Sequence, residues 1–266
     1  MFYIVETQEQ LNDFNKKGYK EAYIEVIPYS YKTHPTITDV SLVYIRPFES
    51  TKGYILTVDH SEGLPLNSDL IGESISKFDK LYVWGKKEFM HFYVHKKLST
   101  PTHRILEQRN QNKLDINRII PLVKHYESCE GNYNNLKKYK DEQVNKFYNN
   151  TVPLVFKFIE QSGIRVDSQL FEDHFDRNSQ NRVYTQYNLN TTTTRPSNKF
   201  GGVNFAALNK ENGCRKAFIP ENDKFLEMDI SAYHPTLAAR LVGYKFDAED
   251  IHESFAKMYG VDYKKS

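Results

Sequence analysis

The sequence has 266 residues, of which 39% are hydrophobic and 26% are charged, and its formal net charge is +2. No stretch approaches the roughly 18 consecutive apolar residues that a membrane span needs, and the N-terminus lacks the basic and apolar regions of a secretion signal. These features predict a soluble, cytoplasmic chain of about two domains that has no membrane partner. Cys129 and Cys214 stand alone in the sequence, which favours two free thiols over a disulfide or a zinc site.

The N-terminal part of the chain predicts a mixed α/β unit. It begins with "TQEQLNDFNKKG", in which Thr7 can cap a short helix that ends at Gly18. Four strands are then expected, because short runs rich in β-branched and aromatic residues alternate with turn residues. They are "EAYIEVIPY", "TDVSLVYIRPF", "GYILTVDH" and "KLYVWG". An aromatic helix, "KKEFMHFYVHKKL", follows and ends before Pro101.

From about residue 115 the spacing of apolar residues becomes helical. "DINRIIPLVKHY" predicts one helix, "ESCEGNYNNLKKYKDEQ" a polar patch, and "VNKFYNNTVPLVFKFIEQSG" a second helix with Gly163 at its C-cap. One face of the second helix is apolar and is expected to be buried. Its members are Val152, Leu154, Val155, Phe158 and Ile159. The polar "NTTTTRPSNKFGGVN" then predicts a surface loop that leads into a second domain.

The segment "FLEMDISAYHPTLAARLVGY" predicts a strand that ends on Asp229 and is followed by a helix. A carboxylate at the edge of a sheet is well placed to hold a divalent metal that neutralises phosphate charge in nucleotidyl transfer. The same residue could instead be the N-cap of the helix "YHPTLAARLV". This segment alone leaves both roles open.

Motifs in four separated segments of the chain occur in an order that resembles the family A DNA polymerases, the type found in bacterial polymerase I and in T-odd phages. In that family a "PL…E..G..VD" helix precedes a "T.TGR.S….N.Q" loop, then "R..F", then a strand ending in the metal-binding Asp of "D.SQ.E.R", then "D.H". The resemblance covers about residues 150 to 262. The matching positions here are Pro153 to Asp167; Thr192, Thr194, Arg195, Ser197 and Asn204; Arg215 and Phe218; Asp229 and Ser231; and Asp250 with His252.

This resemblance implies template-directed nucleotidyl transfer in DNA replication, with primer–template DNA and dNTPs as substrates. It implies that Asp229 and the carbonyl group of Ile230 bind the catalytic Mg²⁺ or Mn²⁺. It also implies that Arg195 contacts the primer strand near its 3′ end, a task that suits the fixed fork of a guanidinium. The accompanying loop residues are implied DNA contacts, although Asn204 and Arg215 could equally support the loop. They are Thr194, Asn204 and Arg215.

The chain also departs from the polymerase pattern. His234 occupies the position of the family's sugar-discriminating Glu, so discrimination is built differently or relaxed, and Tyr233 could share that steric task. The short spacing between Asp167 and Arg195 leaves room only for a reduced helical thumb. The sequence contains neither the fingers helix nor the second metal-binding Asp, which two-metal transfer needs. We therefore expect a fragment, or one half of a split enzyme completed by a second polypeptide.

The N-terminal unit takes the place of the family's 3′–5′ exonuclease domain, which is RNase H-like. The first strand of that domain should carry two acids two residues apart, but "AYIEVIP" offers only Glu25. Because two-metal hydrolysis needs a carboxylate cluster, we expect a degenerate domain, unless Asp39 and Asp59 are recruited from other strands. Two alternatives to a polymerase thus remain open, a non-catalytic nucleic-acid-binding or scaffold protein and a 3′–5′ exonuclease.

The expected fold class is therefore α/β (α+β), in three parts. Residues 1–110 are expected to form the exonuclease-like domain, and residues 111–190 the helical connection with the reduced thumb. Residues 191–266 are expected to form the first part of a polymerase palm.

Overall fold

The structure is a computed structural model that describes residues 1–100, 116–141, 146–177, 179–191, 195–198, 202–230, 232–246 and 250–262. The chain divides into two compact units, Met1–Ile219 and Pro220–Ser266, and each is described by itself. Among the described helices, none combines the length and the apolar character needed to cross a membrane. The three-part division expected at residues 110 and 190 stays a prediction.

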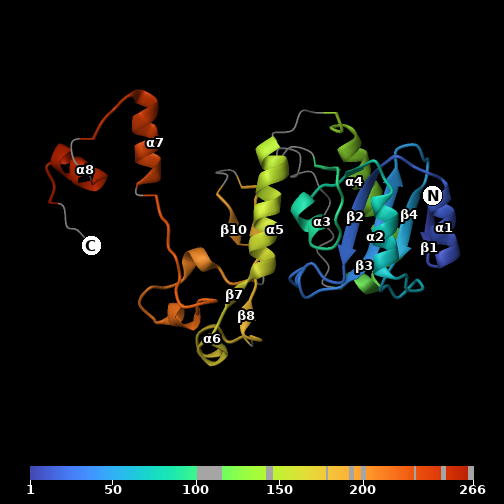
Figure 1. Ribbon diagram of the computed structural model, residues 1–266, viewed down its shortest axis with the longest axis horizontal. Helices are drawn as coiled ribbons and strands as arrows, with labels where there is room; N and C mark the ends of the chain where they lie inside the picture. The colour runs from blue at the N-terminus through green and yellow to red at the C-terminus, as the bar shows by residue number, and fades with distance from the viewer. Residues whose placement is uncertain are drawn as a thin grey trace. The chain divides into compact units, whose positions relative to one another are not determined.

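A mixed six-stranded sheet forms the centre of the first unit, with the strand order β1-β4-β3-β2-β5-β6 (Figure 1). Strand β3 runs antiparallel to both neighbours, and all the other neighbouring pairs are parallel. Without β1, this order and these directions are those of an RNase H-like sheet, so the expected fold class is confirmed. The strands are β1 (Phe2–Val5), β2 (Glu21–Pro28), β3 (Val40–Pro47), β4 (Gly53–Thr57), β5 (Lys80–Tyr82) and β6 (Leu98–Ser99).

Helices cover both faces of this sheet because its strands are apolar on both sides. Helices α1 (Gln8–Lys16), α2 (Ser68–Ser76) and α3 (Lys86–Met90) pack on the face that includes Ile24, and α4 (Leu122–Lys137) packs on the face that includes Tyr23. The alternation of neighbouring β2 residues between two cores is the period-2 pattern of a strand buried on both sides.

Helix α1 begins as its sequence predicts. Thr7 accepts a hydrogen bond from the backbone N–H of Gln10, whose side chain accepts in return from the backbone N–H of Thr7. This capping box satisfies two backbone donors that the first turn leaves unpaired. The strands expected from "EAYIEVIPY", "TDVSLVYIRPF", "GYILTVDH" and "KLYVWG" are confirmed as β2 to β5, whereas β1 and α2 were not predicted.

Helix α4 corrects one prediction. The first half of the helix expected from "DINRIIPLVKHY" is a 3₁₀ turn, Asn117–Ile119, whereas its second half is helical. Helix α4 begins after Pro121 and continues through the segment expected to be a polar patch. The patch is helical because Cys129, Tyr133 and Leu136 recur at helical spacing and are buried against the sheet. The helix expected from "KKEFMHFYVHKKL" is shorter than predicted, because α3 ends at Met90.

The remainder of the first unit contains a longer helix and two short antiparallel strand pairs. A small separate core, in which Val166 and Phe171 are buried, lies among these elements. They are the π-helical turn η3 (Phe147–Thr151), α5 (Val152–Ser162), β7 (Ile164–Arg165), α6 (Ser168–Phe175), β8 (Arg182–Val183), β9 (Tyr187–Asn188), β10 (Ser197–Asn198), and the 3₁₀ turns η4 (Phe205–Ala207) and η5 (Cys214–Ala217). Strand β7 pairs with β8 and β9 with β10, in both cases antiparallel.

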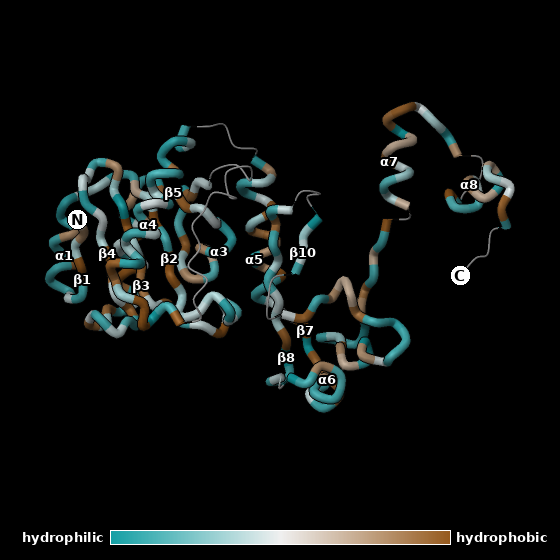
Figure 2. The backbone as a smooth tube through the Cα atoms, turned by 180° about the vertical axis from the view of Figure 1, so that it is seen from behind, coloured by the Kyte–Doolittle hydropathy of each residue, from teal (hydrophilic) through white to brown (hydrophobic). Residues whose placement is uncertain are grey.

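The apolar face of α5 corrects a second prediction. Gly163 ends the helix with a positive φ of 59°, as expected. The predicted apolar face, however, is exposed, with Leu154 at 58% and Phe158 at 71% of full exposure, and the hydropathy colouring of Figure 2 shows the apolar residues along α5. The opposite face is buried instead, because Glu160 on that side is held by residues of α3.

A buried charge cluster fixes that opposite face of α5. Both oxygens of Glu160 are used: Lys87 Nζ lies 2.5 Å from Oε1, His91 Nε2 lies 2.7 Å from Oε2, and the backbone N–H of Tyr187 donates to Oε1 at 2.7 Å. Burial opposes the charges, yet His91 and Lys87 hold the pKa of Glu160 below its usual value, and Glu88 and Glu160 raise that of Lys87. The pair is therefore charged at neutral pH.

The second unit contains α7 (Tyr233–Val242) and α8 (Ile251–Tyr259). Residues 220–230, which include the strand expected to end on Asp229, have no regular secondary structure and are exposed from residue 221 onwards. Within the described part of this unit no strand pairs with them, and an extended segment cannot satisfy its backbone groups without a neighbour. The predicted strand is therefore absent from the structure described for this segment.

Candidate functional site

The second unit contains the predicted metal and sugar-gate residues, and all of them are exposed. Asp229 and Ile230 lie in the irregular segment before α7, and Tyr233 and His234 form its first turn, with their ring centroids 5.4 Å apart. The N-cap of α7 is Ala232, whose φ of 45° is left-handed and whose side chain cannot cap. Asp229 is therefore not the N-cap, and its role in binding metal stays a prediction.

The predicted DNA-contacting residues belong to the first unit. Arg195, Asn204 and Arg215 are exposed, whereas Thr194 lies outside the described residues. The guanidinium of Arg215 donates to the carbonyl oxygen of Leu208 at 3.1 Å, so this side chain braces its own loop. The hydroxyl of Thr191 donates to the carbonyl oxygen of Arg195 at 2.8 Å, which holds the backbone there and leaves the Arg195 side chain exposed.

Glu25 lies on the inner strand β2. It is the one acid that the sequence offers on the first strand of the expected exonuclease-like domain, and it is 6% exposed. The hydroxyl of Tyr23 donates to its Oε2 at 2.5 Å. The amide nitrogen of Asn132, on α4, donates to the same oxygen at 3.0 Å and lies 3.3 Å from Oε1. A phenol and an amide thus donate hydrogen bonds to this buried carboxyl group, which offsets part of the cost of its burial.

A second carboxylate from α4 lies against the same face of the sheet. Glu130 accepts hydrogen bonds from the hydroxyl of Tyr44 and, at 3.1 Å, from Nε of Arg46. Tyr44 is opposite Glu25 in the β2–β3 ladder, and burial together with Glu130 raises the pKa of Tyr44. Sequence reasoning missed Glu130 and Asn132 because their segment was not expected to be helical, although the spacing of its apolar residues carried the signal.

Two histidines lie near this network and are held by backbone groups. His125 Nε2 is 2.9 Å from the carbonyl oxygen of Asn117, and His60 Nε2 is 2.9 Å from that of Ile120. Burial lowers the pKa of both rings, so both are neutral at neutral pH and each donates to its carbonyl. Their role is to satisfy the backbone around the 3₁₀ turn that precedes α4.

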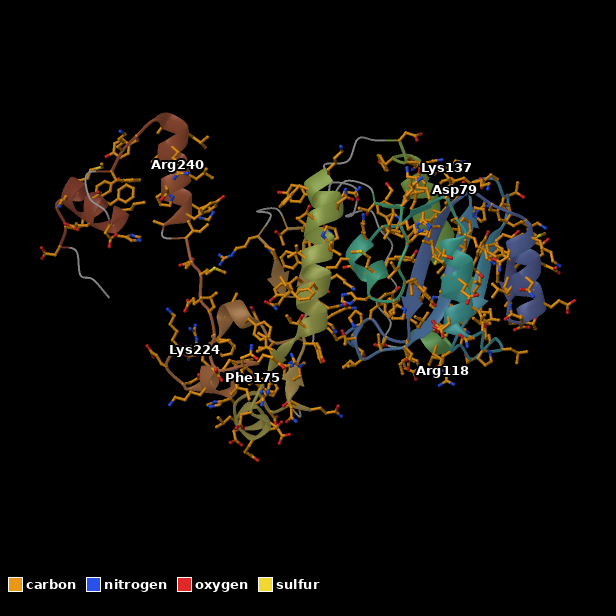
Figure 3. The ribbon with its side chains drawn as sticks, in the orientation of Figure 1. Asp79, Arg118, Lys137, Phe175, Lys224 and Arg240 are labelled. Carbon is orange, nitrogen blue, oxygen red and sulfur yellow. The ribbon has the colours of Figure 1, made fainter. Side chains whose placement is uncertain are left out.

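The donor set around Glu25 does not fit a pair of Mg²⁺ or Mn²⁺ ions. Two-metal hydrolysis needs several carboxylates around one point, and no three His, Cys, Asp or Glu side chains gather in that way anywhere in the described ranges. Asp59 pairs with Arg118 at 3.2 Å, and Asp39 is exposed. Figure 3 labels Arg118 in the first unit. The hydrogen bonds that Glu25 accepts from Tyr23 and Asn132 come from a phenol and an amide.

Comparison with known proteins gives weak structural similarity and no sequence relative. No known family and no curated protein matches the sequence. The structure of Trypanosoma brucei RNase D in complex with RNA U12 is 10% identical, with a TM-score of 0.37 over 54% of this chain and 63% of that one. Escherichia coli RNase D, an exoribonuclease involved in structured RNA processing, is 8% identical, with a TM-score of 0.30 over 42% of this chain and 30% of that one.

The EXO domain of Aedes aegypti Nibbler is 8% identical, with a TM-score of 0.26 over 66% of this chain and 69% of that one. The match covers less than two thirds of the length of each of the two RNase D structures. Overlaps this loose carry no argument about activity, and the fold assignment rests on the strand order of the sheet.

Proposed function

We propose that this chain is a nucleic-acid-binding protein built on an exonuclease-type domain that does not hydrolyse its ligand. The observation that carries the proposal is the environment of Glu25. A nuclease of this fold needs the carboxylates of its inner strand free to bind metal, whereas Tyr23 and Asn132 donate to this one inside the core. Binding is supported by the RNase H-like sheet and by the motif resemblance of the loop around Arg195.

The test is to incubate the purified chain with end-labelled single-stranded RNA and DNA in Mg²⁺ and then in Mn²⁺. Retention of the labelled strand without loss of nucleotides from its 3′ end is the expected result. Glu25→Gln should leave both observations unchanged, and circular dichroism would check that this variant is folded.

A 3′–5′ exonuclease is the second candidate, and the position of Glu25 on the inner strand β2 favours it. Shortening of the strand from the 3′ end by the wild-type chain, lost in Glu25→Gln, would establish that function in place of binding alone. Shortening that persists in Glu25→Gln would indicate a contaminating nuclease, and repurification would remove it.

A third and more specific candidate is a family A DNA polymerase, and it rests on the ordered motifs between residues 150 and 262. It requires Mg²⁺ at Asp229, primer–template DNA, dNTPs, and a second polypeptide that carries the fingers and the rest of the palm. We expect no primer extension by this chain alone. Copurification with such a partner, extension by the complex, and its loss in Asp229→Asn would support this proposal, and a complex that extends equally well with Asp229→Asn would overturn it.

A further inference from the structure

A cluster of tyrosines and lysines lies at the β1 edge of the sheet, away from the Glu25 network. We name it the Tyr3 patch, and its members are Tyr3, Lys17, Tyr19, Lys52 and Tyr54. Tyr3 and Tyr54 are partners in the β1–β4 ladder, and their rings are stacked with centroids 5.6 Å apart. Tyr3 is 43% exposed, so one of the two rings is accessible at the surface.

The two lysines of the Tyr3 patch lie close to its exposed ring. Lys52 Nζ is 2.6 Å from the hydroxyl oxygen of Tyr3 and 4.4 Å from the ring centroid, and Lys17 Nζ is 5.5 Å from the same centroid. Lys17 also donates to the hydroxyl of Tyr54 at 3.0 Å. Both ammonium groups are thus held beside an aromatic face by neutral oxygens and ring electrons.

Neither Lys17 nor Lys52 forms a salt bridge within the part of the chain that the structure describes. The nearby lysines differ, because Lys16 pairs with Asp13 at 2.9 Å and Lys20 lies 4.0 Å from Asp79. The hydrogen bond to Tyr54 is the main cause of a raised pKa at Lys17. The Tyr3 patch therefore has two positive charges that no carboxylate neutralises.

A helix-end role explains only part of this arrangement. Lys17 is the C-cap of α1, and a cation there is stabilised by the negative end of the helix dipole. That account does not cover Lys52, which lies just before β4, nor the exposed ring that both ammonium groups approach. The combination of a flat aromatic face and unneutralised cations is that of surfaces which stack a base and hold its phosphates.

We propose that the Tyr3 patch binds single-stranded nucleic acid, with one base stacked on Tyr3 and the flanking phosphates held by Lys17 and Lys52. This assignment rests on the nucleic-acid binding proposed above, and it names a surface that is separate from Glu25. Single strands fit best because their bases are available for stacking, whereas a duplex offers only its phosphates to this edge.

The experiment measures binding of a fluorescein-labelled oligothymidylate of about 12 nucleotides to the full chain by fluorescence anisotropy over a range of salt concentrations. Lys17→Ala/Lys52→Ala should weaken binding and reduce the slope of log K against log salt by about 1.4, since each lost phosphate contact contributes about 0.7 on a single strand. Tyr3→Leu should weaken binding roughly tenfold while leaving the slope unchanged.

Lys16→Ala/Lys20→Ala is the matched control, because it removes the same charge from two exposed lysines that have carboxylate partners. It should retain the affinity and the slope of the wild type, and thermal melting would check that every variant is folded. Binding by the wild type that survives in folded Tyr3→Leu and Lys17→Ala/Lys52→Ala would overturn the patch and leave the proposed function standing. No binding by the wild type would overturn both, and equal competition by a duplex would overturn the assignment to single strands.

Discussion

Glu160 is a carboxylate that water does not reach, and its attachment to α3 depends on a charge partner that is equally buried. Glu160→Gln leaves the buried Lys87 ammonium with Glu88, at 3.4 Å, as its remaining counter-ion, so we expect the free energy of unfolding to fall by about 3 kcal/mol, the low end for breaking a buried pair. Urea denaturation followed by circular dichroism measures this change. In Glu160→Gln/Lys87→Met the buried ammonium is also removed, so a large part of the loss should be recovered.

Asp13→Asn is the control for this measurement, because it removes one partner of the exposed pair between Asp13 and Lys16. It should leave the urea midpoint unchanged, since surface pairs are screened by solvent. Equal losses in Glu160→Gln and in the double variant would show that the hydrogen bonds of the carboxylate, and not its charge, hold α5 in place.

His34 gives the first unit a dependence on pH. Burial, followed by the charge of the nearby His91, lowers the pKa of His34 from 6.5 to about 4, and its ring stacks on Tyr184 with centroids 5.3 Å apart. The surrounding charged groups are Glu160 and Lys87, and the carbonyl oxygen of Thr185 accepts from the ring. The folded chain therefore contains a neutral ring at a pH at which the unfolded chain takes up a proton.

Because the unfolded chain binds this proton more tightly, the contribution of His34 to the free energy of unfolding decreases as the pH is lowered. The contribution is fully present above about pH 6.5, falls as the unfolded state gains its proton, and stops falling near the folded pKa of about 4. At about pH 5 we expect His34 to account for a loss on the order of 1–2 kcal/mol, reduced by its partial exposure. Urea midpoints measured from pH 7 to pH 4 should fall less steeply in His34→Gln, and parallel curves would contradict the assignment.

At the scale of elements, the sequence predicts those whose own residues determine them. The strands β2, β3 and β4 are rich in β-branched and aromatic residues, and helix α1 carries its own cap, so local pattern identified all four. Helix α4 was predicted only in part because its buried stripe includes Asn132, a polar residue whose burial depends on Glu25 in a distant strand. Such a contact has no signature in the local sequence.

The same reasoning explains what could be predicted of the candidate site. The sequence singled out Glu25 because the resemblance to an exonuclease domain calls for acids on this strand, but one of its hydrogen-bond donors, Asn132, comes from α4. The expected strand before Asp229 had the right composition, yet a strand exists only when another strand pairs with it. The composition of a segment shows that it can form a strand. It does not show whether a neighbouring strand is present to pair with it.

At the scale of the whole molecule, the two units differ in how far they bury their apolar residues. The first has two large clusters around its sheet, whereas in the second Leu226, Met228 and Leu241 are 82%, 85% and 79% exposed. We expect a chain that ends at Ile219 to fold by itself, with a melting temperature within about 3 °C of the full chain. Differential scanning calorimetry measures this, and light scattering should show less self-association.

The opposite result would contradict this expectation. If residues 1–219 did not fold, or melted at a much lower temperature, the exposed apolar residues of the second unit would be shown to stabilise the first. The control is a chain that ends at Ser162. It lacks the β9–β10 strand pair and the backbone N–H of Tyr187 that holds Glu160, so it should be less stable.

The parallel pairing of β1 with β4 has a consequence for the order in which the sheet assembles. Strands β2, β3 and β4 form an antiparallel ladder between neighbours in sequence, which closes short loops at little entropic cost. Tyr3, by contrast, meets its partner Tyr54 only after that ladder has created the edge on which β1 lies. We therefore expect the earliest strand in the chain to be among the last to pair, and until then β4 should offer an open edge to any extended chain nearby.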